Sequence, residues 1–411
     1  MQYNHEIRSK EDLLSHFGSS KQLEILDLQQ MERFSKMDIP PEVWEDASNR
    51  NLLSFNQELV QKTKEFVFND RKIEHIYLIS FLTNITELVL HNNRIYDISS
   101  ISKLKNLMIL DLESNYIEDI SGLQSLPDLT HLFLSSNKLT SYTLALPSLV
   151  KLSLYCNPLQ DTSGLQHSPK LEILYLSATE TTDLSSIPSQ LFGLKDLNLY
   201  HYNITEISYL SNFIDLQSLS LGENKQLSNI EPLKFCTQLT ELNISRTSIA
   251  DIWPLQFMKN LKTLQMNNTQ IVDLHPLQHL YILEIIYAYY ACIIDVFPIS
   301  KLTQLIFLDF RQNQITNAKT LKHHKNFSNY NFQGQQIPTT DKLKFYNKIL
   351  SVHSSHEQIR KIQVENRASK FRESMTHQKE QIELQINEQI RAVNTKIEIW
   401  AQFIQNSEAD Q

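Results

Sequence analysis

The 411-residue sequence predicts an α/β solenoid with parallel strands on its concave face, a helical cap at the N-terminus and a long helical tail at the C-terminus. Three observations lead to this fold class. Residues 63–340 repeat with a period of 22 residues, residues 1–62 break that period, and residues 339–411 contain neither glycine nor proline. We therefore expect three segments, 1–62, 63–340 and 341–411, with about 12 repeats in the middle one.

The repeats carry apolar residues at positions 1, 4, 6, 11, 14, 17 and 20. In the copy that begins at Leu107, Leu110 and Leu112 alternate as expected of a short strand with one buried face. One copy alone buries too little apolar surface to offset the entropy of ordering its backbone, so the copies must stack. The clear copies begin at Ile85, Leu107, Leu129, Leu149, Leu171, Leu194, Leu216, Leu239, Leu261, Leu283 and Leu305, with a degenerate copy at Thr63 and a truncated one at Phe327.

Position 9 follows the strand and is most often asparagine, whose short amide side chain can satisfy backbone groups left free in the turn. Thr179, Thr247 and Thr269 are expected to substitute for it, whereas Tyr202 and Ala291 predict irregular turns. The asparagines are Asn93, Asn115, Asn137, Asn157, Asn224 and Asn313.

The return segment of each repeat begins with residues that restrict or free the backbone. Prolines spaced by 22 residues occupy its start, where a fixed φ and a missing N–H are tolerated: Pro232, Pro254, Pro276 and Pro298. Gly122 and Gly164 share one repeat position at this same start. An aspartate recurs at position 13, as in Asp97 and Asp119.

Residues 1–62 are expected to cover the open core of the first repeat. Ser9 to Asp12 has the composition of a helix start. Pro40 and Pro41 precede a predicted helix with Val43, Trp44, Leu53 and Leu59 on its buried side. The spacing of Leu23, Leu26 and Leu28 fits either an isolated strand or one side of a helix.

The C-terminal segment 341–411 is rich in Gln, Glu, Lys, Arg and Ile and predicts helix. Apolar residues near its end alternate in spacing between four and three, which is the narrow stripe of a coiled coil. We expect the stripe to mediate self-association or to bind a helix of a second protein, while a folded-back hairpin and a solvated helix are alternatives. The stripe consists of Ile386, Ile390, Val393, Ile397, Trp400 and Ile404.

Composition argues against several classes of function. The 6 glycines form no phosphate-binding motif, and the net charge of -8 offers no attraction to nucleic acid. No catalytic motif or paired cysteine metal site occurs, so we expect no enzymatic activity, no metal and no cofactor. The three cysteines, Cys156, Cys236 and Cys292, are odd in number and far apart, which suits a reducing compartment.

The beginning of the chain is polar and lacks the apolar run of a secretory signal. The apolar stretch 280–297 falls in register with the repeat, which accounts for its leucines and isoleucines without a membrane span. We therefore expect a cytoplasmic or nuclear protein without a membrane-spanning segment.

The repeated pattern L-x-x-L-x-L-x-x-N-x-I-x-D-I-x-x-L resembles the 22-residue class of leucine-rich repeat proteins. It is similar to the repeats of the nuclear regulatory subunit of protein phosphatase 1 and to those of bacterial internalins. The resemblance implies a curved solenoid with parallel strands on the concave side and short helical or extended segments on the convex side. It does not identify a ligand.

If positions 4 and 6 point into the core, positions 3, 5, 7 and 8 face the concave side. Aromatic residues with arginine among them are typical of protein-binding hot spots, although tyrosine also favours strands for structural reasons. The candidate partner-binding residues are Glu87, His91, Asp111, Glu113, Phe133, Tyr155, Tyr175, Tyr200, Tyr287, Tyr289, Phe307, Asp309 and Arg311.

The sequence thus predicts a non-catalytic scaffold that binds a protein partner on its concave face. One alternative is a regulatory subunit of a protein phosphatase 1-type enzyme, which would bind the phosphatase catalytic subunit. Others are an internalin-like surface adhesin and an enzyme with a hidden terminal domain, for which 1–62 and the tail leave little room for a core.

Overall fold

The computed structural model describes residues 9–19, 22–25, 27–37, 39–176, 187, 191–326 and 329–334. The chain divides into two units, 1–337 and 338–411, and all described residues belong to the first. The predicted coiled-coil stripe, the beginning of the truncated copy at Phe327 and the turn residue Thr179 lie outside the described residues.

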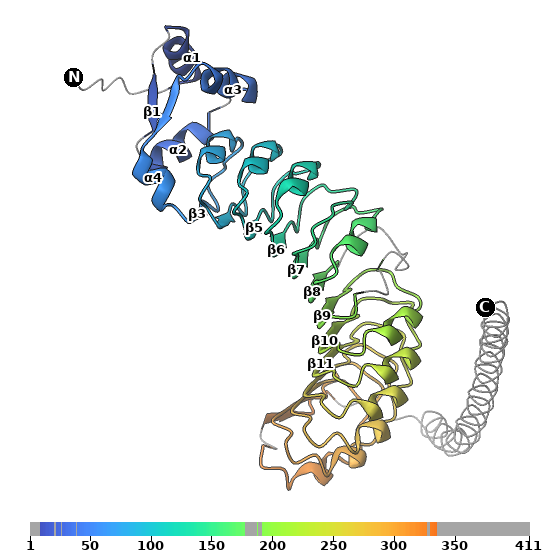
Figure 1. The fold of residues 1–411 in the computed structure, drawn as a ribbon. Helices are drawn as coiled ribbons and strands as arrows, with labels where there is room; N and C mark the ends of the chain where they lie inside the picture. Colours follow the sequence, from blue (N-terminus) through green and yellow to red (C-terminus); the bar gives the residue numbers. More distant parts are fainter. Residues whose placement is uncertain are drawn as a thin grey trace, which may run out of the picture. The chain divides into compact units, whose positions relative to one another are not determined.

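Short parallel strands form one 13-stranded sheet in which each strand pairs with its neighbours in sequence (Figure 1). Identical repeat positions lie side by side, as Leu88 and Leu110 do, so apolar position 4 forms a continuous buried column. The predicted solenoid of parallel strands is confirmed. The strands are β3 (Glu65–Val67), β4 (Glu87–Val89), β5 (Ile109–Asp111), β6 (His131–Phe133), β7 (Lys151–Ser153), β8 (Ile173–Tyr175), β9 (Asp196–Asn198), β10 (Ser218–Ser220), β11 (Glu241–Asn243), β12 (Thr263–Gln265), β13 (Ile285–Tyr287), β14 (Phe307–Asp309) and β15 (Tyr330–Asn331).

Short 3₁₀ helices return the chain on the side opposite the strands (Figure 1). Where position 13 is aspartate, its carboxylate caps the start of the helix, as Oδ1 of Asp97 does by accepting a hydrogen bond from the Ser99 N–H at 2.8 Å. The four prolines lie in the first turn of η7 to η10, as predicted. The helices are η1 (Tyr77–Phe81), η2 (Ser99–Lys103), η3 (Ser121–Ser125), η4 (Ser163–His167), η6 (Ser208–Asn212), η7 (Glu231–Phe235), η8 (Trp253–Phe257), η9 (His275–Leu277), η10 (Phe297–Ile299) and η11 (Ala318–Leu321).

The copy that begins at Leu129 is shorter and returns differently. Its return segment, residues 142–146, is extended and contains no 3₁₀ helix. The Tyr142 N–H donates to the Asp161 carbonyl at 2.8 Å, and the Gly164 N–H donates back to the Tyr142 carbonyl at 2.9 Å. This extended segment therefore lies directly against η4 of the next repeat.

In the described copies, the backbone after the strand turns through a left-handed residue at position 8, with φ between 53° and 68°. Only the last of these copies has glycine there, Gly334, although an L-residue adopts this region at some cost. The other residues are Asp70, Asn92, Ser114, Ser136, Cys156, His201, Glu223, Arg246, Asn268, Tyr290 and Gln312. At Tyr202 a second left-handed residue, Asn203, makes the turn irregular as predicted. The prediction for Ala291 is wrong. The Cys292 N–H donates to the Ile271 carbonyl of the preceding repeat, just as the Tyr116 N–H, in a turn with asparagine at position 9, donates to the Ile95 carbonyl.

The N-terminal segment contains helices together with a small sheet. The elements are α1 (Lys10–Gly18), β1 (Leu23–Ile25), α2 (Leu28–Ser35), α3 (Pro41–Asn49), β2 (Leu53–Phe55) and α4 (Gln57–Lys62), and β1 pairs with β2 in parallel. Ser9 caps α1, as predicted, by accepting a hydrogen bond from the Asp12 N–H at 3.1 Å. Leu23 lies in a strand and Leu28 begins a helix, so each of the two alternatives holds for part of that stretch.

The predicted helix through Val43, Trp44, Leu53 and Leu59 is wrong beyond its first part. The helix ends at Asn49, since Asn51 is left-handed with φ of 57°, and Leu53 lies in β2. Trp44 is nevertheless buried, with its ring centroid 5.8 Å from that of Phe17. These side chains belong to the same apolar core as the first repeats.

Candidate functional site

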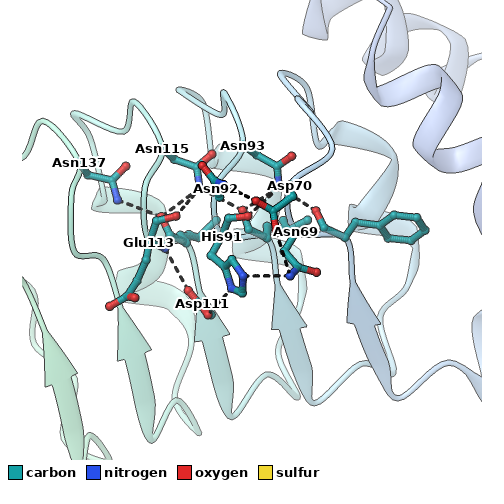
Figure 2. Close-up of polar contacts among 12 residues, drawn as sticks. Asn69, Asp70, His91, Asn92, Asn93, Asp111, Glu113, Asn115 and Asn137 are labelled. Atoms are coloured by element: carbon teal, nitrogen blue, oxygen red, sulfur yellow. Dashed lines mark hydrogen bonds and ion pairs between the residues drawn. The ribbon is translucent and has the colours of Figure 1, made fainter.

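The asparagines at position 9 hold the turns beneath the concave face (Figure 2). The Asn115 Nδ2 donates to the carbonyls of Leu112 and Leu90 at 3.0 Å each, and its Oδ1 accepts from the Ile95 N–H at 2.9 Å. One amide thus joins two repeats, and the prediction for these asparagines is confirmed. Thr247 substitutes only in part, because its hydroxyl donates only to the Ile244 carbonyl, at 2.7 Å.

A polar cluster covers the concave side of β4 and β5 (Figure 2). His91 Nε2 lies 2.9 Å from the Asn69 Nδ2, and His91 Nδ1 lies 3.0 Å from the Asp111 Oδ2. An amide nitrogen only donates, so Nε2 accepts and Nδ1 carries the proton that it donates to Asp111. Both imidazole nitrogens are therefore used within the protein. The partner Asn69 escaped the sequence analysis because it lies in the degenerate first copy.

The carboxylates of this cluster differ in their partners. Asp111 Oδ1 also accepts from the Glu113 N–H at 3.0 Å, so both of its oxygens have hydrogen bonds. The half-buried side chains of Glu87 and Glu113 make no ion pair within the part of the chain that the structure describes. These two carboxylates keep their hydrogen-bonding capacity for a ligand.

A lysine joins two predicted aromatic residues in the middle of the face. The Lys151 Nζ lies 5.1 Å from the ring centroid of Phe133 and 5.6 Å from that of Tyr175. The Tyr175 hydroxyl donates to the Asp196 Oδ2 at 2.8 Å. Burial, together with this hydrogen bond and the negative charge of Asp196, raises the pKa of Tyr175 to about 12.

The neighbouring group is built around Glu223, which the sequence analysis did not select. Its Oε1 accepts from the Tyr200 hydroxyl at 3.2 Å and from the Arg246 Nη1 at 2.7 Å. Burial and the charge of Glu223 raise the pKa of Tyr200. Tyr155 remains 41% exposed and is the most accessible of the predicted residues in the middle of the face.

The strongest aromatic grouping lies on β13, β14 and the turns that follow them; we call Tyr287, Tyr289, Phe307 and Arg311 the aromatic–arginine cluster. The rings of Tyr287 and Phe307 have centroids 5.2 Å apart. The guanidinium of Arg311 lies 5.1 Å from the ring centroid of Tyr289. The adjacent Tyr290, 48% exposed, meets Tyr289 edge to face at 4.9 Å. The structure thus brings together the residues that the sequence favoured most.

Asp309 has a different role from the direct contact that we predicted, because it is only 7% exposed. It receives two hydrogen bonds from the Arg311 guanidinium, from Nε at 2.8 Å and from Nη2 at 2.6 Å. Burial raises the pKa of Asp309, but these bonds and the Arg311 N–H outweigh burial and lower it overall. Asp309 therefore orients Arg311 over Tyr289.

A hollow of about 680 Å³ lies beside the aromatic–arginine cluster. Phe307 and Arg311 line it together with Tyr330 and Phe332 from the last strand and its turn. Tyr330 and Phe332 were not predicted, because the truncated copy gives no clear repeat register.

The cations of the concave positions are all engaged within the protein. Arg311 pairs with Asp309, Arg246 pairs with Glu223, and Lys151 lies against two aromatic rings. Among the described residues, no group of three or more His, Cys, Asp or Glu side chains could hold a metal ion.

No helix in the described ranges has both the length and the apolar character needed to cross a lipid bilayer. The stretch 280–297 instead contains β13 and the start of η10, in register with the other repeats.

The stacked strands and asparagine-held turns define a leucine-rich repeat solenoid, and the chain belongs to the leucine-rich repeat family. Residues 83–139 match the leucine-rich repeat family model. The chain is 30% identical to an internalin, InlF of Listeria monocytogenes, over 68% of this chain and 76% of that one, with a TM-score of 0.54. No curated protein matches it.

Two further solved structures share the fold. A leucine-rich repeat protein of Leptospira interrogans is 20% identical, with a TM-score of 0.50 over 76% of this chain and all of that one. The ectodomain of the Arabidopsis thaliana receptor kinase GASSHO1/SCHENGEN3, solved in complex with CASPARIAN STRIP INTEGRITY FACTOR 2, is 17% identical with a TM-score of 0.50. The match covers 77% of this chain and 47% of the receptor ectodomain.

Proposed function

We propose that this protein is a non-catalytic scaffold that binds a protein partner on its concave face, inside the cell, in the cytoplasm or the nucleus. The aromatic–arginine cluster is the observation that carries the proposal. Tyrosine and arginine are among the residues enriched in protein-binding hot spots, and here they are adjacent on one face. Leucine-rich repeat domains commonly act as interaction scaffolds, and the matched Arabidopsis receptor was solved with a bound partner.

The cluster is ordered before any partner arrives. The two hydrogen bonds that the Arg311 guanidinium donates to Asp309 fix its orientation, and the Tyr289 ring supports its face. Binding then costs less side-chain entropy than it would with a free arginine. The internal pairing of Arg311 and Arg246 also favours a protein partner over a polyanion such as nucleic acid.

The test compares two triple variants in affinity purification followed by mass spectrometry. The concave variant replaces Tyr287, Tyr289 and Phe307 with alanine. The control variant replaces three exposed phenylalanines of the return segments, Phe235, Phe257 and Phe297, which are 50%, 40% and 60% exposed.

We expect one or more proteins to be retained by the wild type and the control and lost by the concave variant. Equal melting temperatures would show that both variants keep the fold. If the concave variant retains every protein that the wild type retains, this surface is not the binding site.

Two narrower functions can be tested alongside. Regulation of a phosphatase 1-type enzyme would require retention of the purified catalytic subunit, and absence of binding would eliminate it. The 30% identity to InlF favours a surface adhesin as the second candidate function. Antibody labelling of intact cells that express the protein would distinguish the adhesin from an intracellular scaffold.

We also propose that the apolar stripe of segment 341–411 self-associates or binds a second partner, because its spacing is that of a coiled coil. Sedimentation of the full chain and of a chain ending at residue 340 tests self-association. A full chain that sediments as a monomer at micromolar concentration would contradict it.

A further inference from the structure

The first strand of the sheet, β3, has an outer edge with unpaired backbone groups. In the repeats that begin at Ile85 to Leu305, the position 3 N–H donates to the preceding repeat, as Ile109 does to the Thr86 carbonyl at 3.0 Å. The position 5 carbonyl likewise accepts from the preceding repeat, as that of Asp111 does from the Leu90 N–H at 2.8 Å. The equivalent groups of β3 are the Glu65 N–H and the Val67 carbonyl. Neither has a hydrogen-bond partner among the described residues.

The N-terminal cap leaves space beside this edge. A hollow of about 920 Å³ is lined by the start of α2, by α4 and by residues 63–65. Half-buried Leu28 and Leu59 supply its apolar wall. The cap therefore does not supply the hydrogen bonds that a preceding strand would supply.

The side chains of β3 indicate what kind of strand fits there. Glu65 lies directly beside Glu87 of β4, so two like charges are neighbours in the sheet. Val67 lies beside Val89 and is 52% exposed, whereas Phe66, which lies between Glu65 and Val67 in β3, is buried. A segment beside β3 would best place a basic residue next to Glu65 and apolar residues next to Phe66 and Val67.

We propose that β3 is a docking edge that accepts an extended segment of a protein partner as an additional strand, with a basic–apolar–apolar triplet facing residues 65–67. Backbone hydrogen bonds to the Glu65 N–H and the Val67 carbonyl supply affinity, and the three side-chain neighbours supply specificity. The charges of Lys64 and Glu65 disfavour indiscriminate edge pairing. This edge lies at the opposite end of the sheet from the aromatic–arginine cluster on β13 and β14, so the two docking sites are independent.

Fluorescence anisotropy with a labelled peptide Ser-Thr-Lys-Ile-Val-Thr-Ser tests the proposal on the full chain. Two substitutions of Glu65 separate the contribution of its side-chain charge from that of its backbone N–H. Glu65→Gln removes the charge and keeps the edge N–H, whereas Glu65→Pro removes both. Proline is tolerated there because that N–H bonds nothing in the sheet.

We expect saturable binding that Glu65→Gln weakens, most strongly at low salt, and that Glu65→Pro weakens by a further five- to tenfold, about the value of one hydrogen bond. Equal binding by the two variants would overturn the proposal. If Glu65→Pro does not fold, the test is the charge exchange: Glu65→Lys should lose the lysine peptide and regain a peptide with glutamate at that place. A Glu65→Lys protein that still prefers the lysine peptide would overturn the proposal.

The concave triple variant serves as the control for position. Retention of the peptide places it away from Tyr287, Tyr289 and Phe307, as we expect, and loss of the peptide would refute the edge as its site. The outcome is independent of whether that variant loses the partner of the concave face, so the two proposals fail separately.

Discussion

Alanine in place of Gly164 is expected to destabilise the solenoid, whereas alanine at Gly122 is not, although both glycines occupy the same repeat position. A Cβ at Gly164 would lie 2.7 Å from the backbone nitrogen and oxygen of Leu144 and from the carbonyl carbon of Thr143. A Cβ at Gly122 would meet its nearest atoms at 3.6 Å, which is ordinary van der Waals contact. The difference arises because the extended return segment after Tyr142 lies against η4.

The magnitude follows from the atoms involved. Leu144 and Thr143 oppose the new methyl group with backbone, which cannot rotate away as a side chain could. Relief requires a shift of the extended segment, and overpacking of this kind costs about 2–3 kcal/mol. Alanine at Gly122 meets no obstacle and reduces the entropy of the unfolded chain, for a gain of about 0.4–1 kcal/mol.

Thermal unfolding of the two variants and the wild type provides the measurement. A loss of about 2–3 kcal/mol corresponds to a melting temperature roughly 3–4 °C lower for Gly164→Ala, while Gly122→Ala should melt at or slightly above the wild type. Hydrogen exchange should accelerate first around residues 142–165, because repeats of a solenoid open locally. If the two alanine variants melt at the same temperature, the close approach at Gly164 does not limit stability.

Two further stability changes and one titration are expected. Asn115→Ala should lower the free energy of unfolding by about 3 kcal/mol and Thr247→Ala by about 1 kcal/mol in urea denaturation, because the amide satisfies several buried backbone groups and the hydroxyl one. The hydrogen bond that the His275 Nδ1 donates to Asp273 outweighs burial and raises the pKa of His275. Their interaction therefore stabilises the fold fully below the unfolded pKa of about 6.5 and is lost as pH rises through the higher folded pKa. The melting temperature of Asp273→Asn should therefore fall below that of the wild type most strongly in acid, and a pH-independent difference would contradict this reasoning. Tyr175 should ionise near pH 12 when its titration is followed by NMR. The substitution Asp196→Asn should move the pKa of Tyr175 toward 10.

The spacing of leucines, asparagines and prolines was sufficient to predict the sheet, its order and the return segments. These features are local or repeat at a fixed interval, so the backbone conformation that suits one repeat also suits the next. The grouping of Tyr287, Tyr289, Phe307 and Arg311 also followed, because equivalent positions of adjacent repeats lie side by side.

The partners of those residues did not follow from the pattern. The repeat positions predict Asp309 as a contact residue, but it is buried and paired with Arg311, because side-chain pairing depends on distances that repeat positions do not specify. The turn at position 8 is left-handed in the described copies, yet Gly334 is the one glycine among these residues and no single residue type indicates the turn. The cap differs most from the prediction. The apolar spacing predicts one helix through Leu59, but α3 ends at Asn49 because Asn51 adopts a left-handed conformation.

The sequence by itself determined the period, the parallel sheet and the face on which exposed aromatic residues gather, because burial of a repeated apolar pattern has a single economical arrangement. Only the tertiary structure decided how closely neighbouring repeats approach. Gly122 and Gly164 occupy the same repeat position, yet there is room for a side chain at Gly122, whereas the backbone of the shortened repeat leaves none at Gly164. The open edge at Glu65 was likewise decided by where the cap lies, because an unpaired backbone group is defined by the absence of a neighbour in space.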